Sequence, residues 1–265
     1  MDKKKILLVT HEMDPYLAIS RAATMVRELP KPIQDSDMDI RILMPRFGTI
    51  NERRHRLHEV VRLSGINIVV NDEDYPLIIK VASLPGARLQ VYFLDNEDYF
   101  RRKFVFNDKN DAPFEDNDER MIFFAQGVLE TVKKFGWPPN VIHCHGWMTS
   151  LIPLYLRTVY SNEPVFENTK IVYSVYENQF DGDFGDNFQH KARVEEVLPN
   201  GDLEVFNNGD NTSLNIGGAT YADKVLLVDE PSNGTFKSIK KDKIALKGEE
   251  VTPEATVELY KSLID

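Results

Sequence analysis

The chain has 265 residues, of which 42% are hydrophobic and 28% charged, enough for one large α/β domain or two small ones. Its net charge of −10 argues against a nucleic-acid-binding surface, which requires clustered positive charge. The apolar run 6–9 is too short for a signal peptide, and no stretch approaches the ~20 residues of a membrane helix. With a single cysteine, Cys144, there is no internal disulfide. We therefore expect a cytoplasmic protein that binds neither nucleic acid nor membrane.

The first half of the chain alternates between strand-like and helix-like patterns. Compact or alternating apolar runs predict strands, periodic runs predict helices, and Pro30 and Pro32 are expected to end the first helix. The polar turn 71–75 between two strands predicts a hairpin, and the polar segment 107–117 predicts a loop. The predicted strands are 4–11, 38–44, 66–70, 77–81 and 89–94, and the predicted helices are 17–29 and 51–60.

A long helix over 118–135 opens the second half, with apolar residues at intervals of three and four and Gly136 as its C-terminal stop. The elements predicted after it are a strand at 141, a helix from about 149, strands 170–176 and 224–229, loops with short elements over 181–219, and a terminal helix opening at 252–254. Alternating strands and helices predict a doubly wound parallel sheet. We expect one Rossmann-like domain over 1–236, followed by a basic linker and a C-terminal helix that packs on it over 237–265.

The segment 139–156 is the most informative in the chain. It reads as a buried strand that ends in His143, Cys144 and His145 and continues through Gly146 and Trp147 into a helix. In parallel α/β sheets this junction is where ligands bind. The two histidines share one face of the strand, but a metal site would need a third ligand, so no metal is predicted. Trp147 would either stack on a sugar or cap the core, and the sequence leaves both open.

Three other clusters have simpler interpretations. The aspartates at 181, 183 and 186 lack the spacing and terminal glutamate of a calcium loop. The arginines at 53, 54 and 56 would spread around a helix, which favours an exposed face over a phosphate site. Cys144 on a buried strand is expected to be inert as a nucleophile.

Six blocks in register, over about 4–230, resemble the glycogen and starch synthase family. The segment 143–156 is similar to that family's H-x-H-D-W-H-x-x-L-x-P-x-x-L, with Gly146 in place of Asp and Met148 in place of His. The other blocks are similar to the family's E-x-x-P, second strand, Y-F-x-R, D-N-x-x-R and last strand; they lie at 12–15, 41–47, 99–101, 116–120 and 221–225.

The resemblance implies the N-terminal domain of a two-domain GT-B glycosyltransferase, which moves glucose from ADP-glucose to an α-1,4-glucan with the donor held mainly by the second domain. It implies α-glucan as a partner and no resident cofactor. The residues that it marks as candidate substrate contacts are Trp147, His145, Tyr99, Asn117 and Arg120.

Family positions that contact the donor differ in this chain. Ala18 stands where the family has the lysine of K-x-G-G-L, leaving Arg21 as the candidate diphosphate contact, and Tyr176 stands at the histidine that contacts the sugar. The chain is also about long enough for only the first of the family's two domains. We therefore identify no catalytic residue and do not expect independent catalysis. The alternatives are a non-catalytic glucan-binding or regulatory module, and one half of a split synthase whose donor domain is a partner chain.

Overall fold

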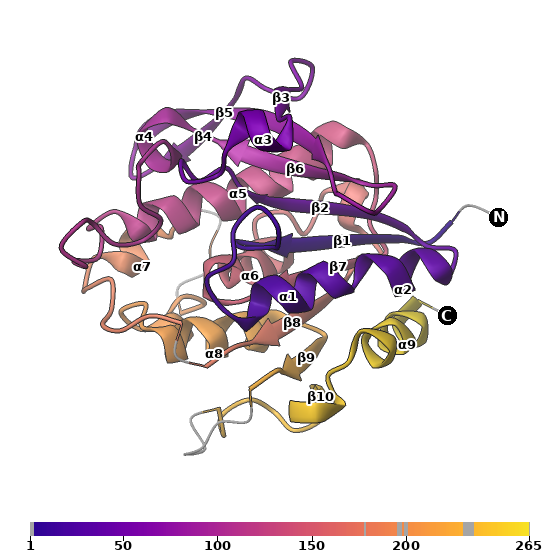
Figure 1. Ribbon diagram of the computed structural model, residues 1–265. Helices are drawn as coiled ribbons and strands as arrows, with labels where there is room; N and C mark the ends of the chain where they lie inside the picture. Colours follow the sequence, from indigo (N-terminus) through magenta and orange to yellow (C-terminus); the bar gives the residue numbers. More distant parts are fainter. Residues whose placement is uncertain (1–2, 178, 195–197, 199–200, 230–235, 265) are drawn as a thin grey trace.

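The computed structural model describes residues 3–264 except 178, 195–197, 199–200 and 230–235 (Figure 1). Its strands form one mixed sheet in the order β10-β9-β8-β7-β1-β2-β6-β5-β3, with β4 paired to β5. The strands are β1 (Lys5–Thr10), β2 (Asp39–Pro45), β3 (His58–Glu59), β4 (Ile66–Val70), β5 (Glu73–Ser83), β6 (Gln90–Asp95), β7 (Val141–His145), β8 (Lys170–Val175), β9 (Lys224–Leu227) and β10 (Ile244–Lys247).

The α/β class is confirmed, and the sheet is parallel from β10 to β6. At one end the sheet is antiparallel, because β5 runs antiparallel to β6, β4 and β3. Strand β5 reaches β6 through the connection 84–89, where the N–H of Leu84 donates to the carbonyl of Leu89 at 3.0 Å. The predicted hairpin joins β4 to β5: Val70 pairs with Glu73 across Asn71 and Asp72, which both have positive φ. A two-residue turn of this kind reverses the chain and returns the strand antiparallel.

Helices cover both faces of the sheet (Figure 1), as a doubly wound fold requires. One face carries α1, α2 and α9, and the other carries α5, α6 and α8. The helices are α1 (Arg21–Glu28), α2 (Pro30–Asp35), α3 (Glu52–His55), α4 (Glu97–Phe100), α5 (Asn117–Phe135), α6 (Leu151–Arg157), α7 (Phe188–Lys191), α8 (Asn211–Tyr221) and α9 (Pro253–Ile264). Within the described residues, no helix is long and apolar enough to cross a membrane.

The predicted core strands and the long helix form as expected. Every residue of β7 is buried, as are the five residues of β1 from Ile6 to Thr10, because strands in the middle of a doubly wound sheet are covered on both sides. Helix α5 buries its apolar face and ends at Gly136, whose left-handed φ of 57° lets its N–H reach the carbonyl of Lys133.

Two sequence predictions in the first half are wrong in detail. The first helix ends before Pro30, as predicted, but it begins at Arg21 and not at Leu17. Pro30 then opens a second helix, α2, because proline is well accommodated in the first turn, where no intrahelical N–H bond is lost. The charged helix expected over 51–60 is reduced to the single turn α3, which stops at Arg56 in the left-handed conformation. The chain then enters β3, where backbone pairing with β5 replaces the helix.

Two elements in the second half were not predicted. Helix α8 begins within 181–219, where loops and short elements were expected, and ends at Tyr221; its N-cap Asp210 accepts the N–H groups of Thr212 and Ser213 at 2.9 Å. Its glycines weaken the apolar periodicity from which a helix is predicted. Gly218 is needed for packing, because a β-carbon there would lie 2.7 Å from the Tyr173 ring. Strand β10 follows the predicted basic linker and pairs with β9.

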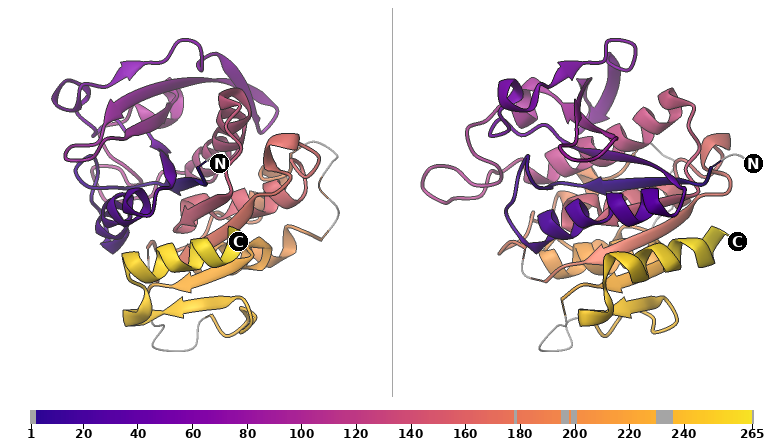
Figure 2. Two further views of the ribbon diagram at one scale, coloured as in Figure 1. Left: turned by 90° about the vertical axis from the view of Figure 1, so that its right-hand side faces the viewer. Right: turned by 45° about the vertical axis from the view of Figure 1, so that its right-hand side comes forward.

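Residues 237–264 thus supply a strand and a helix, which lie together at one end of the sheet (Figure 2). Helix α9 contacts β7 and α2. The domain boundary at 236 remains a prediction.

Candidate functional site

A hollow lies beyond the carboxyl ends of β1, β7 and β8. It has a volume of about 1180 Å³ and is bordered by three connecting segments and by Trp147. The segments are Ile19 after β1, the loop 104–117 before α5, and the strip 179–185 after β8. We call this hollow the aromatic cavity, because Phe104, Phe106, Phe114, Trp147, Phe180 and Phe184 line it.

Sheet topology fixes the position of the cavity. From β1 the chain builds the sheet in one direction through β2 and β6, and later in the other direction through β7, β8 and β9. Register places Thr10 beside His145 and His145 beside Ser174, so that the loops leaving β1, β7 and β8 emerge side by side. Ligands of open α/β sheets bind at such a switch point.

Gly146 turns the chain out of β7. Its φ of 75° is a left-handed conformation that glycine adopts without steric cost, and its N–H donates to the carbonyl of Ser174 at 3.1 Å. The turn delivers Trp147 to the cavity wall at the start of a short 3-10 helix, Trp147–Thr149.

Trp147 is wrapped by other aromatic rings. The centroids of Phe180, Phe106 and Phe184 lie 4.8, 5.0 and 5.8 Å from the indole, and the side chain is 2% exposed. The indole therefore caps the core in this conformation while forming part of the cavity wall. Its Nε1 has no hydrogen-bond partner among the described residues.

His145 and His143 lie one above the other on β7, with ring centroids 3.9 Å apart. Nδ1 of His145 is 3.0 Å from the Tyr176 hydroxyl. Burial is the main cause that lowers the pKa of His145 to about 3, and electrostatic repulsion by the nearby His11 adds to it. Burial, followed by His145, lowers the pKa of His143 well below its ordinary value. Both imidazoles are therefore neutral at physiological pH, and His145 is available as a neutral hydrogen-bonding group.

Several buried polar atoms near Gly146 lack partners in the described part of the chain. A β-carbon at 146 would lie 2.7 Å from Gln179 Oε1 and 3.1 Å from His11 Cε1, so both side chains reach this glycine. The unpartnered atoms are His11 Nδ1, His145 Nε2, Trp147 Nε1 and Gln179 Nε2. Buried polar atoms normally bind water or a ligand when protein supplies no partner. Among these four residues, Trp147 and Gln179 line the aromatic cavity, and His11 and His145 do not.

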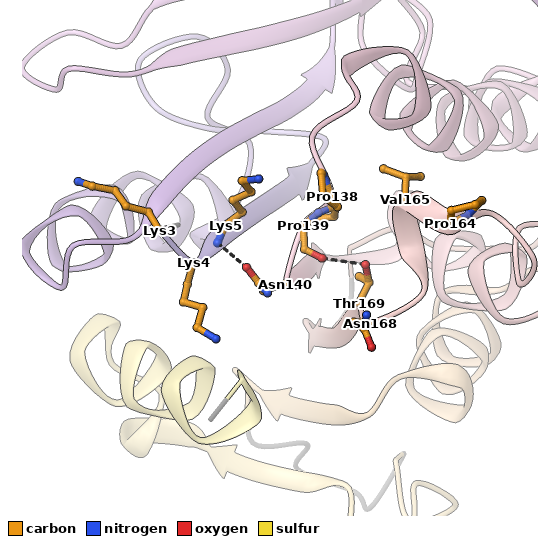
Figure 3. Close-up of a pocket in the computed structure, with 10 residues that line it drawn as sticks. All are labelled: Lys3, Lys4, Lys5, Pro138, Pro139, Asn140, Pro164, Val165, Asn168 and Thr169. Carbon is orange, nitrogen blue, oxygen red and sulfur yellow. Dashed lines mark hydrogen bonds between the residues drawn. The ribbon is translucent and has the colours of Figure 1, made fainter. Parts of the chain in front are cut away.

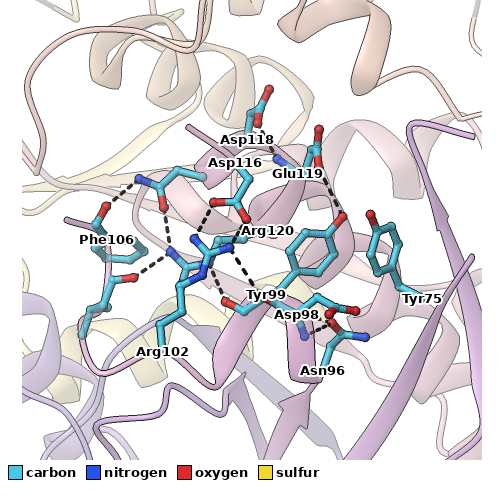
Figure 4. Close-up of polar contacts among 12 residues, drawn as sticks. Tyr75, Asn96, Asp98, Tyr99, Arg102, Phe106, Asp116, Asp118, Glu119 and Arg120 are labelled. Carbon is cyan, nitrogen blue, oxygen red and sulfur yellow. Dashed lines mark hydrogen bonds and ion pairs between the residues drawn. The ribbon is translucent and has the colours of Figure 1, made fainter. Parts of the chain in front are cut away.

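The three remaining candidate substrate contacts form a network beside the cavity (Figure 4). Asn117 borders the cavity. Arg120 is 1% exposed and donates to the carbonyls of Tyr99 at 2.8 Å and Val105 at 2.6 Å, and to Asn117 Oδ1 at 2.7 Å. Burial lowers the pKa of Arg120 to about 10, so the guanidinium keeps its charge. Its role in this structure is to hold the loop 104–117 in place.

Tyr99 belongs to the same hydrogen-bond network behind the loop 104–117. It is 2% exposed, its ring lies 4.5 Å from that of Tyr75, and its hydroxyl donates to Glu119 at 3.4 Å. Of the five candidate contacts, the structure thus brings Trp147 and Asn117 to the cavity, with His145 directly behind. Tyr99 and Arg120 position the wall and do not line it.

Arg21 lies at a different hollow, of about 610 Å³, between the start of α1 and the end of β9. Its guanidinium approaches the carbonyl of Val228 at 3.3 Å and Asp229 at 3.4 Å. Asp229, Glu249 and Glu250 line this hollow against Arg21 and Lys247. The site therefore holds more carboxylates than cations, which disfavours a diphosphate.

The start of α1 already holds an anion. The Glu12 carboxylate accepts the backbone N–H groups of Ile19 and Ser20 at 2.6 and 2.7 Å, and the Ser20 hydroxyl at 2.5 Å. Burial would raise the pKa of Glu12, but His11 and Ser20 outweigh it and lower that pKa to about 2. An incoming phosphate would have to displace this carboxylate.

A smaller hollow of about 340 Å³ lies on the opposite side of the sheet, at the amino-terminal ends of β1, β7 and β8 (Figure 3). Lys3, Lys4 and Lys5 line it, but their side chains point in three different directions. Lys3 pairs with Asp37 and Lys4 donates to the carbonyl of Ile264, so the ammonium groups do not converge on one anion. Elsewhere in the described ranges, no three His, Cys, Asp or Glu side chains gather as metal ligands would.

Sequence reasoning missed Gln179, Phe180, Phe106 and His11. The alternation of Phe104 with Phe106, and the spacing of Phe180 and Phe184, are the signals that would have pointed to an aromatic wall. Gln179 carries no such signal, because its contact with Trp147 depends on how two loops fold together.

Comparison with known proteins assigns this fold to a class. The catalytic domain of starch synthase IV from Arabidopsis thaliana, bound to ADP and acarbose, superimposes with a TM-score of 0.75 at 15% identity, over 93% of this chain and 52% of that one. This likeness shows a fold of the GT-B glycosyltransferase class. The family model for the starch synthase catalytic domain matches residues 5–239, and the chain belongs to that family.

Two curated relatives agree with this assignment. A glycogen synthase of Chlorobium limicola is 39% identical over 220 residues, covering 83% of this chain and 44% of its own length. A glycogen synthase of Chlorobium phaeobacteroides is 36% identical over 254 residues, covering 92% and 52%. The chain thus spans about half the length of these relatives.

Proposed function

We propose that the aromatic cavity binds an α-glucan and that the chain by itself does not transfer glucose. The observation that carries the first part is the combination of aromatic rings with an unpartnered buried donor, Trp147 Nε1, on the cavity wall. Sugar faces stack on aromatic rings, and sugar hydroxyls satisfy isolated donors and acceptors. The family relation and the acarbose bound to the starch synthase support the same ligand class.

The second part rests on the residues at family donor positions. Tyr176 replaces the histidine, is fully enclosed, and shares a hydrogen bond with His145. Burial raises the pKa of its phenol far above the ordinary value, so it does not exchange protons near neutral pH. Ala18 supplies no charge, and Arg21 faces Asp229. The chain uses no resident cofactor in this proposal.

Glycogen affinity electrophoresis tests glucan binding. We expect retardation of the native chain, loss of retardation in Trp147→Ala, and no change in Trp137→Ala, because Trp137 contacts Arg41 away from the cavity. A stacked indole in a packed site typically contributes about 2 kcal/mol or more. Thermal melts of both variants separate lost binding from lost folding. Absence of retardation of the native chain at millimolar glucan would refute the proposal.

Radiolabelled ADP-glucose incubated with glycogen tests the catalytic part. Counts in precipitated glycogen should equal those of a protein-free control. Transfer above that control, abolished by Tyr176→Phe, would show that the tyrosine has taken over a catalytic task.

A second candidate is one half of a split synthase. The chain spans about half of its relatives, and Ile19 and Phe104 are 51% and 46% exposed on the cavity rim, where a second domain would pack. Adding a separately expressed donor-type domain of a glycogen synthase should then restore transfer. Either role fits a cytoplasmic protein whose cysteine, Cys144, is buried and free.

A further inference from the structure

We propose that the strip 179–185, which we call the strap, is a latch that closes the aromatic cavity over Trp147 and must release before a glucan can stack on the indole. The inference rests on the proposed function, because it describes how access to that same cavity is controlled. The reason for the proposal is that Trp147, the ring best suited to stack on a sugar, is only 2% exposed. A sugar cannot reach the indole while the strap covers it.

One hydrogen bond fastens the strap at its start. Gln179 Oε1 accepts the backbone N–H of Trp147 at 3.1 Å. Gln179 fits there because residue 146 is glycine; a β-carbon would lie 2.7 Å from Gln179 Oε1, closer than real contacts allow. Gly146 and Gln179 are therefore a matched pair, and the residue that departs from the family pattern at 146 makes the latch possible.

Aromatic contacts hold the rest of the strap. Phe180 and Phe184 stack on each other at 5.4 Å and cover the indole at 4.8 and 5.8 Å. The N–H of Phe184 donates to the carbonyl of Asn208 at 2.8 Å, which anchors the far end. The strap is thus tied to the end of β7 at one point and to the segment before α8 at another.

The strap has features that permit opening. Gly182 and Gly185 have φ of 85° and 83°, and a β-carbon at either position would meet no atom within 4 Å, so both glycines lie in open space. Asp181 and Asp183 are exposed to solvent. Opening at the Gln179 end breaks one hydrogen bond, to Trp147, and the ring contacts, while the bond between Phe184 and Asn208 holds the far end. A glucan hydroxyl would then accept a hydrogen bond from Trp147 Nε1.

Fluorescence quenching tests the latch without any glucan. The chain has two tryptophans, so in a Trp137→Phe background the fluorescence comes from Trp147 alone. Quenching of that fluorescence by acrylamide then reports the exposure of the Trp147 indole. Gln179→Ala should increase the acrylamide quenching constant, because it removes the acceptor for the backbone N–H of Trp147 and so loosens the strap over the indole. Gln179→Glu keeps that oxygen and should quench like the parent. Gln189→Ala is the matched control, since Gln189 donates to Asn207 outside the strap.

The same proteins are then titrated with maltoheptaose. Loss of one neutral hydrogen bond from the closed state should lower the apparent Kd about three- to tenfold in Gln179→Ala. Unchanged quenching in Gln179→Ala, with the variant folded by its melt, would overturn the latch. Increased quenching with weaker binding would also overturn it, because Gln179 would then be a ligand contact. If no protein binds maltoheptaose, the proposed function fails, while quenching still decides whether the strap opens.

Discussion

The hydroxyl of Tyr260 in α9 lies 2.5 Å from Nδ1 of His143 in β7, across 117 residues of sequence. The opposite nitrogen of the imidazole, Nε2, lies 2.7 Å from the Ser174 hydroxyl in β8. Both ring nitrogens are thus paired inside the core, and α9 is tied to the strand that leads into the aromatic cavity. This pair explains how a segment after the predicted linker can influence the stability of the candidate site.

Removing the Tyr260 hydroxyl should therefore destabilise the whole sheet. We expect Tyr260→Phe to lower the free energy of unfolding by about 1–3 kcal/mol, because His143 Nδ1 is left buried without a partner. Urea denaturation followed by circular dichroism measures this. Tyr92→Phe is the control, since its hydroxyl bonds to exposed Gln90, and it should stay within about 0.5 kcal/mol. Equal losses of unfolding free energy in the two variants would contradict a stabilising hydrogen bond between Tyr260 and His143.

The buried histidines should make stability fall as the solution is acidified. The pKa of His145 is lowered from 6.5 to about 3 in the folded chain, and that of His143 is also lowered, so the unfolded state binds more protons below pH 6.5. Their contribution is complete above that pH and is lost as the pH falls below it, by ~1.4 kcal/mol per pH unit for each histidine. Urea midpoints between pH 7 and 5 measure the slope. His190→Gln, at an exposed position, should leave it unchanged, and a flat profile in the native chain would disprove the prediction.

Glu12 should contribute stability in a lower pH window. Its folded pKa of about 2 lies below its ordinary 4.5, so its contribution is present above 4.5 and is lost as the pH falls towards 2. Glu12→Gln should lower the free energy of unfolding at pH 7 by about 2–3 kcal/mol. The difference between native chain and variant should shrink when unfolding is measured at pH 3. An effect as small as that of exposed Glu258→Gln would mean that the Ile19 and Ser20 amides find water instead.

Nucleotide affinity should be low. We expect ADP to bind with a Kd at or above about 1 mM, equivalent to roughly −4 kcal/mol. The reason is that Glu12 occupies the start of α1 and Asp229 neutralises Arg21. Isothermal titration calorimetry measures this, and Asp229→Asn should strengthen binding if Arg21 is the contact. Micromolar affinity in the native chain would show that a diphosphate site exists despite these carboxylates.

Much of the scaffold could be predicted because its signals are local. Apolar strands such as β1 and β7, the periodic face of α5 and the stop at Gly136 each depend on a few neighbouring residues. Helix α8 and strand β10 escaped because their stability comes from packing against Tyr173 and pairing with β9. Tertiary contacts of this kind leave little trace in periodicity.

Residue order was enough to predict the α/β class, the family and the junction at Gly146 and Trp147, because alternating patterns and short motifs can be followed along the chain. The tertiary structure set what surrounds that junction. It covered Trp147 with rings from two distant loops, gave Arg120 and Tyr99 supporting positions, and paired His143 with Tyr260. These contacts join residues far apart in the chain, and their geometry depends on how the strands align side by side.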